Sequence, residues 1–262
     1  MMIKRFFHDI AKFWDYMIYS AKSQLRAELA NSWLGGLWWV LEPTLSMLVY
    51  MFVFTVVFNR TTTYVVAFIV IGLSYWRFFN NCVIGSITLV RRHRAVISKV
   101  YIPKFILLGA SMMVNAFKLL CAYVPIIVLM FYYEVPMTWH MLTILPLTAL
   151  MFLFTFGICC WMMHVGVYVE DMSKLITIIL QLVFYLSGVF FPINEMLEPA
   201  LAQTIFNFNP MALIIFEARN SLLYGVPCQW TQVGIFFAVA VVLSLWGVAM
   251  LYKRESQYIK VV

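Results

Sequence analysis

The stretch MLTILPLTALMFLFTFGICCWMMHVGVY, Met141 to Tyr168, contains no Asp, Glu, Lys or Arg. A helix needs about 20 predominantly apolar residues to cross the hydrocarbon core of a bilayer, and this stretch is longer than that. The whole chain has 262 residues, of which 64% are hydrophobic and 11% are charged, whereas soluble domains carry about 45–50% apolar and about 25% charged residues. The sequence therefore predicts an all-α integral membrane protein.

Similar apolar runs recur along the chain and predict six transmembrane helices. The runs cover approximately residues 38–58, 64–88, 105–132, 141–168, 175–192 and 231–252. We therefore expect three parts: an N-terminal segment 1–37, a six-span domain 38–252 and a tail 253–262. Residues 193–230 hold apolar pieces too short to span, interrupted by Pro199, Asn209-Pro210 and Gly225, and such pieces predict re-entrant or interfacial helices on the outer side.

The N-terminal segment is amphipathic over residues 3–29. Phe7, Ile10 and Trp14 follow one another at helical spacing, and basic residues occupy the other positions. This pattern favours a helix lying in the membrane interface. An ordinary helix packed on the bundle would give the same periodicity.

The net charge of +7 does not indicate nucleic-acid binding, because the Lys and Arg residues gather at the ends of the apolar runs. Most of them fall on one side of the six predicted spans, and only Arg60 and Arg219 fall in segments on the other side. Cytoplasmic segments of membrane proteins carry the excess of Lys and Arg. The charge distribution therefore predicts that both termini are cytoplasmic.

The densest basic patch is RRHRAVISKVYIPKF, Arg91 to Phe105, between the second and third predicted spans. An orientation signal would account for its three arginines. Val96, Ile97, Val100 and Tyr101 fall in addition on one face of a helix, and Pro103 would end that helix just before the next span. We expect a short amphipathic cytoplasmic helix here.

The chain lacks the motifs of several classes of enzyme. It has no GxxxxGK[ST] phosphate loop, no HExxH and no GxSxG motif, so it is expected to bind no nucleotide, metal or other cofactor of its own. Paired intramembrane carboxylates, which a proton-coupled transporter would use, are also missing from the predicted spans. These observations disfavour catalysis and ion-coupled transport.

Two cations, Arg77 and Lys118, fall roughly half-way along predicted spans. Ionisable side chains at this depth usually face a cavity or a partner. One hypothesis is that they line a passage for an anionic or hydroxyl-rich substrate, with Tyr75 and Trp76 offering aromatic faces to sugar rings. The alternatives are snorkelling, a misplaced span boundary or pairing inside the bundle, and for the aromatic residues a place in an interfacial belt.

Several motifs together resemble those of one family. They are RAELANSWLGGLWWVLEPTL (Arg26–Leu45), Lys99-Val100-Tyr101-Ile102-Pro103, VYVEDMSKLI after the fourth span, FYLSGVFFPINEM (Phe184–Met196) and NPMALIIFEARNSLLYG (Asn209–Gly225). The chain resembles the membrane subunit of type-2 ABC exporters, in the branch that exports lipid-linked polysaccharides such as O-antigen, capsule and teichoic acid. The resemblance covers nearly the whole chain.

The resemblance implies a half-channel in the bacterial inner membrane, completed by a second copy and driven by a cytoplasmic ATPase dimer that binds ATP and Mg²⁺. The N-terminal helix would be a gate, where Lys4, Arg5, Lys12 and Arg26 attract either the pyrophosphate of the substrate or anionic membrane lipids. Arg91, Arg92, Arg94, Lys99 and Tyr101 would belong to a coupling helix that contacts the ATPase. Two alternatives remain, a type-2 ABC exporter of a drug or small lipid and a polytopic enzyme acting on a lipid-linked sugar.

Overall fold

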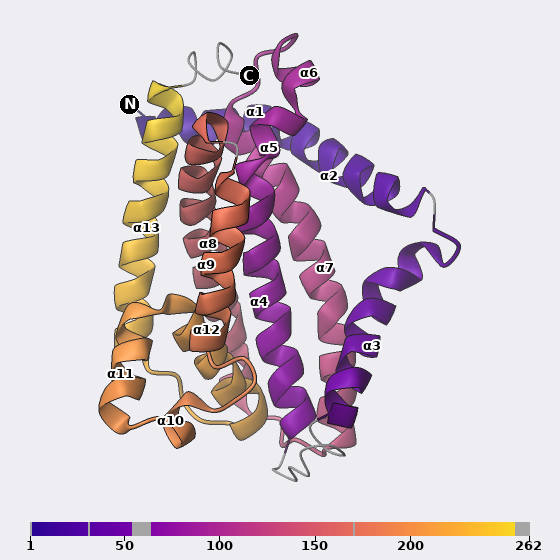
Figure 1. Ribbon diagram of the computed structural model, residues 1–262, viewed down its shortest axis with the longest axis vertical. Coiled ribbons are helices and arrows are strands. Elements are labelled where there is room, and N and C mark those ends of the chain that lie inside the picture. The colour runs from indigo at the N-terminus through magenta and orange to yellow at the C-terminus, as the bar shows by residue number, and fades with distance from the viewer. Residues whose placement is uncertain (1, 31, 54–63, 170, 255–262) are drawn as a thin grey trace.

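The computed structural model describes residues 2–30, 32–53, 64–169 and 171–254, and these ranges contain helices and no strand (Figure 1). Arg60, Glu170, Lys260 and residues 54–58 of the first expected span lie outside them, as do residues 255–262 of the expected tail. The helices are α1 Met2–Lys12, α2 Trp14–Leu29, η1 Gly35–Leu37, α3 Trp38–Met51, α4 Val65–Ile87, α5 Leu89–Arg92, α6 Arg94–Ile97, α7 Lys104–Tyr132, η3 Trp139–Thr143, α8 Ile144–Tyr168, α9 Met172–Leu186, α10 Ile193–Met196, α11 Pro199–Phe208, α12 Pro210–Arg219, the π-helix η4 Asn220–Tyr224 and α13 Trp230–Lys253.

Four of the described helices are long and apolar enough to cross a membrane: α4, α7, α8 with the preceding η3, and α13. They coincide with the second, third, fourth and sixth expected spans, so the all-α membrane fold is confirmed. Helix α9 is shorter, and the described part of α3 ends at Met51. The total of six spans therefore stays a prediction.

Helix α4 lies at the centre of the bundle. Within its most apolar window 72% of the residues are buried, compared with 33–39% in the other three spans. Helix α8 approaches α4 so closely that a methyl group on Gly166 would overlap the Ile87 carbonyl, and α13 packs along the opposite side of α8 at Gly247. Small residues allow such close approach between membrane helices.

The N-terminal segment forms two helices rather than the single helix expected over residues 3–29. Helix α1 crosses one end of the bundle, the chain bends at Phe13, and α2 slopes away from the bundle toward α3 (Figure 1). Met17 and Ala21 are buried on the side of α2 that packs on α7, while Phe7 and Trp14 are exposed. The apolar stripe thus packs on the bundle only in part, and the position of α1 and α2 in the membrane interface stays a prediction.

At the opposite end of the bundle lie α10 and α11, and α11 bends by 108° into α12. The Asn209 side chain caps α12 by accepting hydrogen bonds from the backbone N–H groups of Met211 and Ala212, at 3.1 and 3.2 Å. Helix α12 then packs against α4 and α8. The turn at Asn209-Pro210 therefore directs the chain back into the bundle, an arrangement compatible with the expected re-entrant segment.

Arg219, at the end of α12, is buried instead of lying on an outer loop. Its side chain covers the ring of Phe68 and donates three hydrogen bonds, to the carbonyl oxygens of Phe68 (2.9 Å), Gly188 (2.9 Å) and Val189 (2.7 Å). The sequence analysis treated Arg219 only as an outer charge, because the return of α12 into the bundle is a tertiary feature. The guanidinium ties α12 to α4 and to the turn after α9.

Candidate functional site: a polar cavity between α2, α3, α4 and α7

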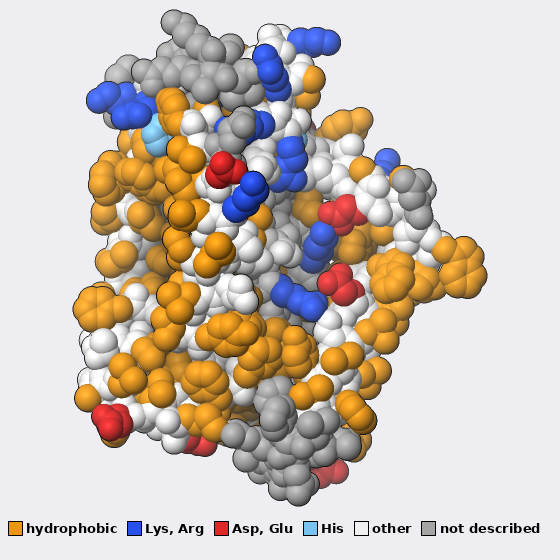
Figure 2. Space-filling view, viewed as in Figure 1, with side chains coloured by type: hydrophobic (Ala, Val, Ile, Leu, Met, Phe, Trp, Pro, Cys, Tyr) orange, Lys and Arg blue, Asp and Glu red, His pale blue; other side chains and the backbone are white. Residues whose placement is uncertain are grey.

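A cavity of about 610 Å³ lies between α2, α3, α4 and α7. Figure 2 shows Lys, Arg, Asp and Glu side chains gathered around a hollow in this part of the surface. The polar residues that line the cavity are Glu28, Ser32, Glu42, Ser46, Ser74, Arg77, Asn81, Asn115 and Lys118, and the large aromatic residues are Trp33, Trp38, Trp39 and Phe78. The helices around the cavity do not cover it completely, and Figure 2 shows the hollow open on the face in view.

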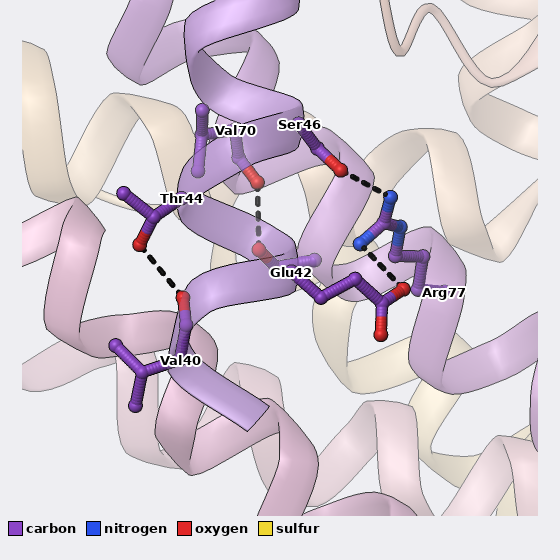
Figure 3. A network of polar contacts seen from close by, with 7 residues as sticks. Val40, Glu42, Thr44, Ser46, Val70 and Arg77 are labelled. Carbon is purple, nitrogen blue, oxygen red and sulfur yellow. Dashed lines mark hydrogen bonds and ion pairs between the residues drawn. The ribbon is translucent and has the colours of Figure 1, made fainter. Parts of the chain in front are cut away.

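Arg77 projects from α4 toward α3. Its Nη2 donates a hydrogen bond of 2.8 Å to Ser46 Oγ, and its Nη1 lies 3.5 Å from Glu42 Oε1 (Figure 3). Both partners come from α3, where Thr44 Oγ1 also donates to the Val40 carbonyl at 2.7 Å within the helix. Arg77 is therefore the main polar connection between α3 and α4.

Lys118 makes the corresponding contact from α7. Its Nζ donates a hydrogen bond of 2.8 Å to Glu28 Oε1 on α2. The two cations thus come from helices of the bundle, and the two carboxylates come from the N-terminal elements α2 and α3. Each side chain remains partly exposed, at 39% for Arg77, 70% for Glu42, 35% for Lys118 and 44% for Glu28.

The surroundings of Arg77 and Lys118 reduce the energetic cost of a charged side chain in a membrane span. Arg77 and Lys118 lie near the middle of α4 and α7, where an unpaired cation would be expensive. Each cation has a carboxylate partner and an open cavity beside it. The sequence analysis treated pairing inside the bundle and lining of a cavity as alternatives. In the structure Arg77 and Lys118 do both.

The four residues expected to line a channel divide into two groups. Arg77 and Lys118 line the cavity, whereas Tyr75 and Trp76 are buried inside the bundle. The Tyr75 hydroxyl shares hydrogen bonds with Tyr123 Oη (2.7 Å) and Thr148 Oγ1 (3.1 Å). Successive helical residues point about 100° apart, so residues 75 and 76 face other helices when residue 77 faces the cavity.

The aromatic lining comes instead from Trp33, Trp38 and Trp39. The sequence analysis assigned tryptophans of this kind to an interfacial belt by default. The ring of Trp39 packs edge-on against Phe117 of α7, with 4.9 Å between ring centroids. In the sequence Trp33 precedes the first expected span, and Trp38 and Trp39 stand at its start. That position does not specify a cavity.

The four residues expected at a substrate entrance are exposed on the N-terminal helices. Lys4, Arg5 and Lys12 lie on α1, Arg26 lies on α2, and the lining of the cavity includes none of them. Lys12 covers the ring of Phe13 at 5.4 Å. Their role in attracting a substrate or lipid stays a prediction.

The expected coupling helix is shorter than the sequence predicts. Helices α5 and α6 end at Ile97, residues 98–103 are not helical, and Pro103 directly precedes α7. Val96, Val100 and Tyr101 are therefore exposed without forming one continuous helical face, and Ile97 is buried. Proline disfavours helical backbone only at the residue before it, so Pro103 accounts for the non-helical backbone at Ile102 and not for the end of α6 at Ile97.

The five expected coupling residues also differ in their surroundings. Arg91 donates to the Val167 carbonyl at 3.3 Å and Arg92 to the Gly85 carbonyl at 2.7 Å. Arg94, Lys99 and Tyr101 are exposed. Figure 1 shows α5 and α6 at the same end of the bundle as α1 and the last turn of α13. The exposed cations at this end include Arg94 and Lys99, besides Lys4, Arg5 and Lys12 of α1.

Residues 17–223 match the model of the family described as ABC-2 type transporter. The chain belongs to the ABC-2 type transporter family. The match includes α3 to α12, and with them the whole lining of the cavity and the surface at α5 and α6. The family expected from the sequence motifs is confirmed.

Several curated proteins resemble this ABC-2 transporter chain over nearly its full length. The O-antigen export system permease protein RfbA of Myxococcus xanthus is 23% identical, and that of Klebsiella pneumoniae is 21% identical, with 97% of both chains covered in each case. The polysialic acid transport protein KpsM of Escherichia coli is 19% identical over 89% of this chain and 91% of its own. The ABC-2 chain is thus a multi-pass membrane transport subunit.

Proposed function

We propose that this chain is the permease of an ATP-driven exporter that moves a lipid-linked polysaccharide, such as an O-antigen or capsule-like glycan, across the bacterial inner membrane. The observation that carries the proposal is the side-opening cavity, which joins tryptophan faces to charged and amide side chains at the middle of the spans. Aromatic faces suit sugar rings, and polar groups suit hydroxyls and anionic groups. The names of the relatives support the same substrate class.

The complete exporter would contain a second copy of this chain and a cytoplasmic ATPase dimer holding ATP and Mg²⁺. Support for the ATPase contact comes from the family and from the exposed cations Arg94 and Lys99. This arrangement places both termini in the cytoplasm, in agreement with the positive-inside rule.

The export assay is a deletion of the coding sequence followed by complementation. The deletion is expected to abolish the surface polysaccharide and to leave lipid-linked glycan on the cytoplasmic side, and the plasmid-borne chain is expected to restore export. Surface polysaccharide at the wild-type level in the deletion strain would refute the proposal.

The ATPase contact needs its own test. The double variant R94E/K99E is expected to lower copurification of the ATPase subunit, because both side chains are exposed and the reversal spares the backbone contacts of Arg91 and Arg92. K174E is the matched control, since Lys174 is an exposed cation at the start of α9. If the wild type, R94E/K99E and K174E all copurify with the ATPase subunit equally well, the ATPase contact does not involve Arg94 or Lys99.

A second candidate function is export of a drug-sized molecule or small lipid. The cavity volume of about 610 Å³ favours it, because pockets for drug-sized ligands measure about 300–1,000 Å³. Efflux of a panel of hydrophobic dyes from cells that express the chain with its ATPase separates the two functions. Dye efflux with unchanged surface polysaccharide would favour the small-molecule exporter.

A further inference from the structure

Two ion pairs connect the N-terminal elements to the bundle across the cavity. Glu28 on α2 pairs with Lys118 on α7, and Glu42 on α3 pairs with Arg77 on α4. In both pairs the cation belongs to a helix of the bundle, and the carboxylate belongs to an element at the open side of the cavity. The two ion pairs therefore hold α2 and α3 against the bundle, on the side of the cavity from which a ligand would enter.

Both cations have hydrogen-bonding capacity to spare. An arginine side chain has five N–H donors and a lysine three, and among the described residues Arg77 donates to two acceptors and Lys118 to one. The distance of 3.5 Å between Arg77 Nη1 and Glu42 Oε1 exceeds the usual 2.7–2.9 Å of a charge-assisted hydrogen bond. The Glu42 side chain is 70% exposed, so a stronger anion can replace it at little cost.

Each cation also has an asparagine on the same helical face. Asn81 lies four residues after Arg77, Asn115 lies three residues before Lys118, and all four side chains line the cavity. Residues three or four apart on a helix are neighbours on its surface. The bundle side of the cavity thus carries two cation–amide pairs, a combination suited to a group with several acceptor oxygens.

We propose that this cavity is an anion-exchange site, in which a phosphate or diphosphate ester displaces Glu28 from Lys118 and Glu42 from Arg77. The inference rests on the proposed function, since a lipid-linked glycan carries such an ester between its lipid and its sugar. Without ligand the two carboxylates neutralise cations that would otherwise be unpaired at mid-span. With ligand they are released, so α2 and α3 lose their ion pairs to α7 and α4, and α3 keeps the hydrogen bond from Arg77 to Ser46.

The exchange has a functional consequence. Binding of the ester loosens the attachment of α2 and α3 to the bundle beside the cavity, and the return of the carboxylates favours release of the ester. A ligand shifts such an equilibrium only through different contacts in its two states. Here the difference is whether the cations contact the carboxylates or the ester oxygens.

The test measures binding of farnesyl diphosphate and of farnesol to the purified permease–ATPase complex in phosphatidylcholine nanodiscs, by calorimetry. R77Q and K118Q are each expected to weaken binding of the diphosphate about tenfold or more and to leave farnesol unchanged. E28Q and E42Q are expected to tighten diphosphate binding several-fold, because the competing carboxylate is gone. K22Q is the matched control, as Lys22 is an exposed cation of α2 outside the cavity lining.

Several results would overturn the exchange. Equal affinity of the wild-type complex for farnesyl diphosphate and farnesol would do so, as would weaker diphosphate binding in E28Q and E42Q. Loss of diphosphate binding in phosphatidylglycerol nanodiscs would support the exchange and would identify a lipid headgroup, in place of the glycan's diphosphate, as the source of the ester. R77K, which keeps the charge, is expected to retain part of the affinity and separates loss of charge from loss of fold.

A cellular measurement distinguishes failure of this inference from failure of the proposed function. If the deletion strain loses its surface polysaccharide but R77Q and K118Q restore it fully, the exchange is wrong and the exporter function stands. If the deletion strain keeps its surface polysaccharide, the exporter function itself is wrong. If the deletion removes the polysaccharide and the two glutamine variants restore little of it, both stand.

Discussion

Arg5 and Tyr101 are hydrogen-bonded, with 3.0 Å between Arg5 Nη2 and the Tyr101 hydroxyl, although 96 residues separate them. The guanidinium also covers the ring of Tyr252, whose hydroxyl donates a 2.6 Å hydrogen bond to Asp9 Oδ2. One cluster thus joins α1, the segment before α7 and the end of α13. The sequence analysis assigned Arg5 to the substrate entrance and Tyr101 to the ATPase contact, and the structure connects the two regions directly.

Tyr101→Phe removes the hydroxyl of this contact and nothing else. Because the bond is exposed, the free energy of unfolding is expected to fall by no more than about 1 kcal/mol. If the contact transmits motion from the ATPase to α1, polysaccharide exported per ATP hydrolysed falls in the variant while ATP hydrolysis continues. Tyr19→Phe, at an exposed tyrosine of α2, is the control. An unchanged export ratio in Tyr101→Phe would show that the bond has no part in coupling.

Arg219→Lys tests the buried guanidinium. A lysine keeps the charge but cannot reproduce the planar set of donors that reaches the carbonyls of Phe68, Gly188 and Val189. Each hydrogen bond of a charged group that the lysine cannot make costs about 1.5–3 kcal/mol, so the thermal unfolding midpoint in detergent is expected to fall. Arg26→Lys, at an exposed arginine, is expected to have no effect. A wild-type midpoint in Arg219→Lys would contradict this account.

Gly247→Ala tests the contact between α13 and α8. A methyl group there would lie 2.7 Å from Cys160 Cβ, and the helices would have to separate. The expected loss is about 1–3 kcal/mol of folding free energy, measured by thermal unfolding. Gly234→Ala on the same helix is the control, because a methyl group at residue 234 meets nothing within 4 Å. Similar midpoints for the two variants would rule out tight packing at Gly247.

Asn209→Ala removes the cap of α12. The loss of the acceptor for the Met211 and Ala212 N–H groups is expected to destabilise the protein by about 0.5–2 kcal/mol. Asn209→Asp keeps the acceptor and loses only the 3.0 Å hydrogen bond from Asn209 Nδ2 to Ser187 Oγ. Its thermal unfolding midpoint should therefore lie above that of Asn209→Ala, and a midpoint as low as that of Asn209→Ala would contradict the capping role.

The sequence singled out Arg77 and Lys118 for a general reason, and both line the cavity, while their place in a substrate channel stays a prediction. A cation in the middle of an apolar run must have a polar neighbour, and this requirement follows from composition and spacing alone. Their partners Glu28 and Glu42 could not be predicted in the same way. Glu28 lies in a segment where an exposed charge needs no explanation, and Glu42 lies near the start of the first expected span. Which cation each carboxylate meets depends on how α2 and α3 pack beside α7 and α4.

The sequence by itself determined that this chain spans a membrane, where four of its spans lie and which family motifs it carries, because hydrophobic runs and local motifs are properties of short segments. Tertiary structure alone decided that Tyr75 and Trp76 face the interior, that Trp33 and Trp39 line the cavity, and that Arg219 is buried. These features arise from contacts between helices far apart in the chain. A side chain's surroundings are then set by the direction in which its helix packs, and residue order along the helix does not specify that direction.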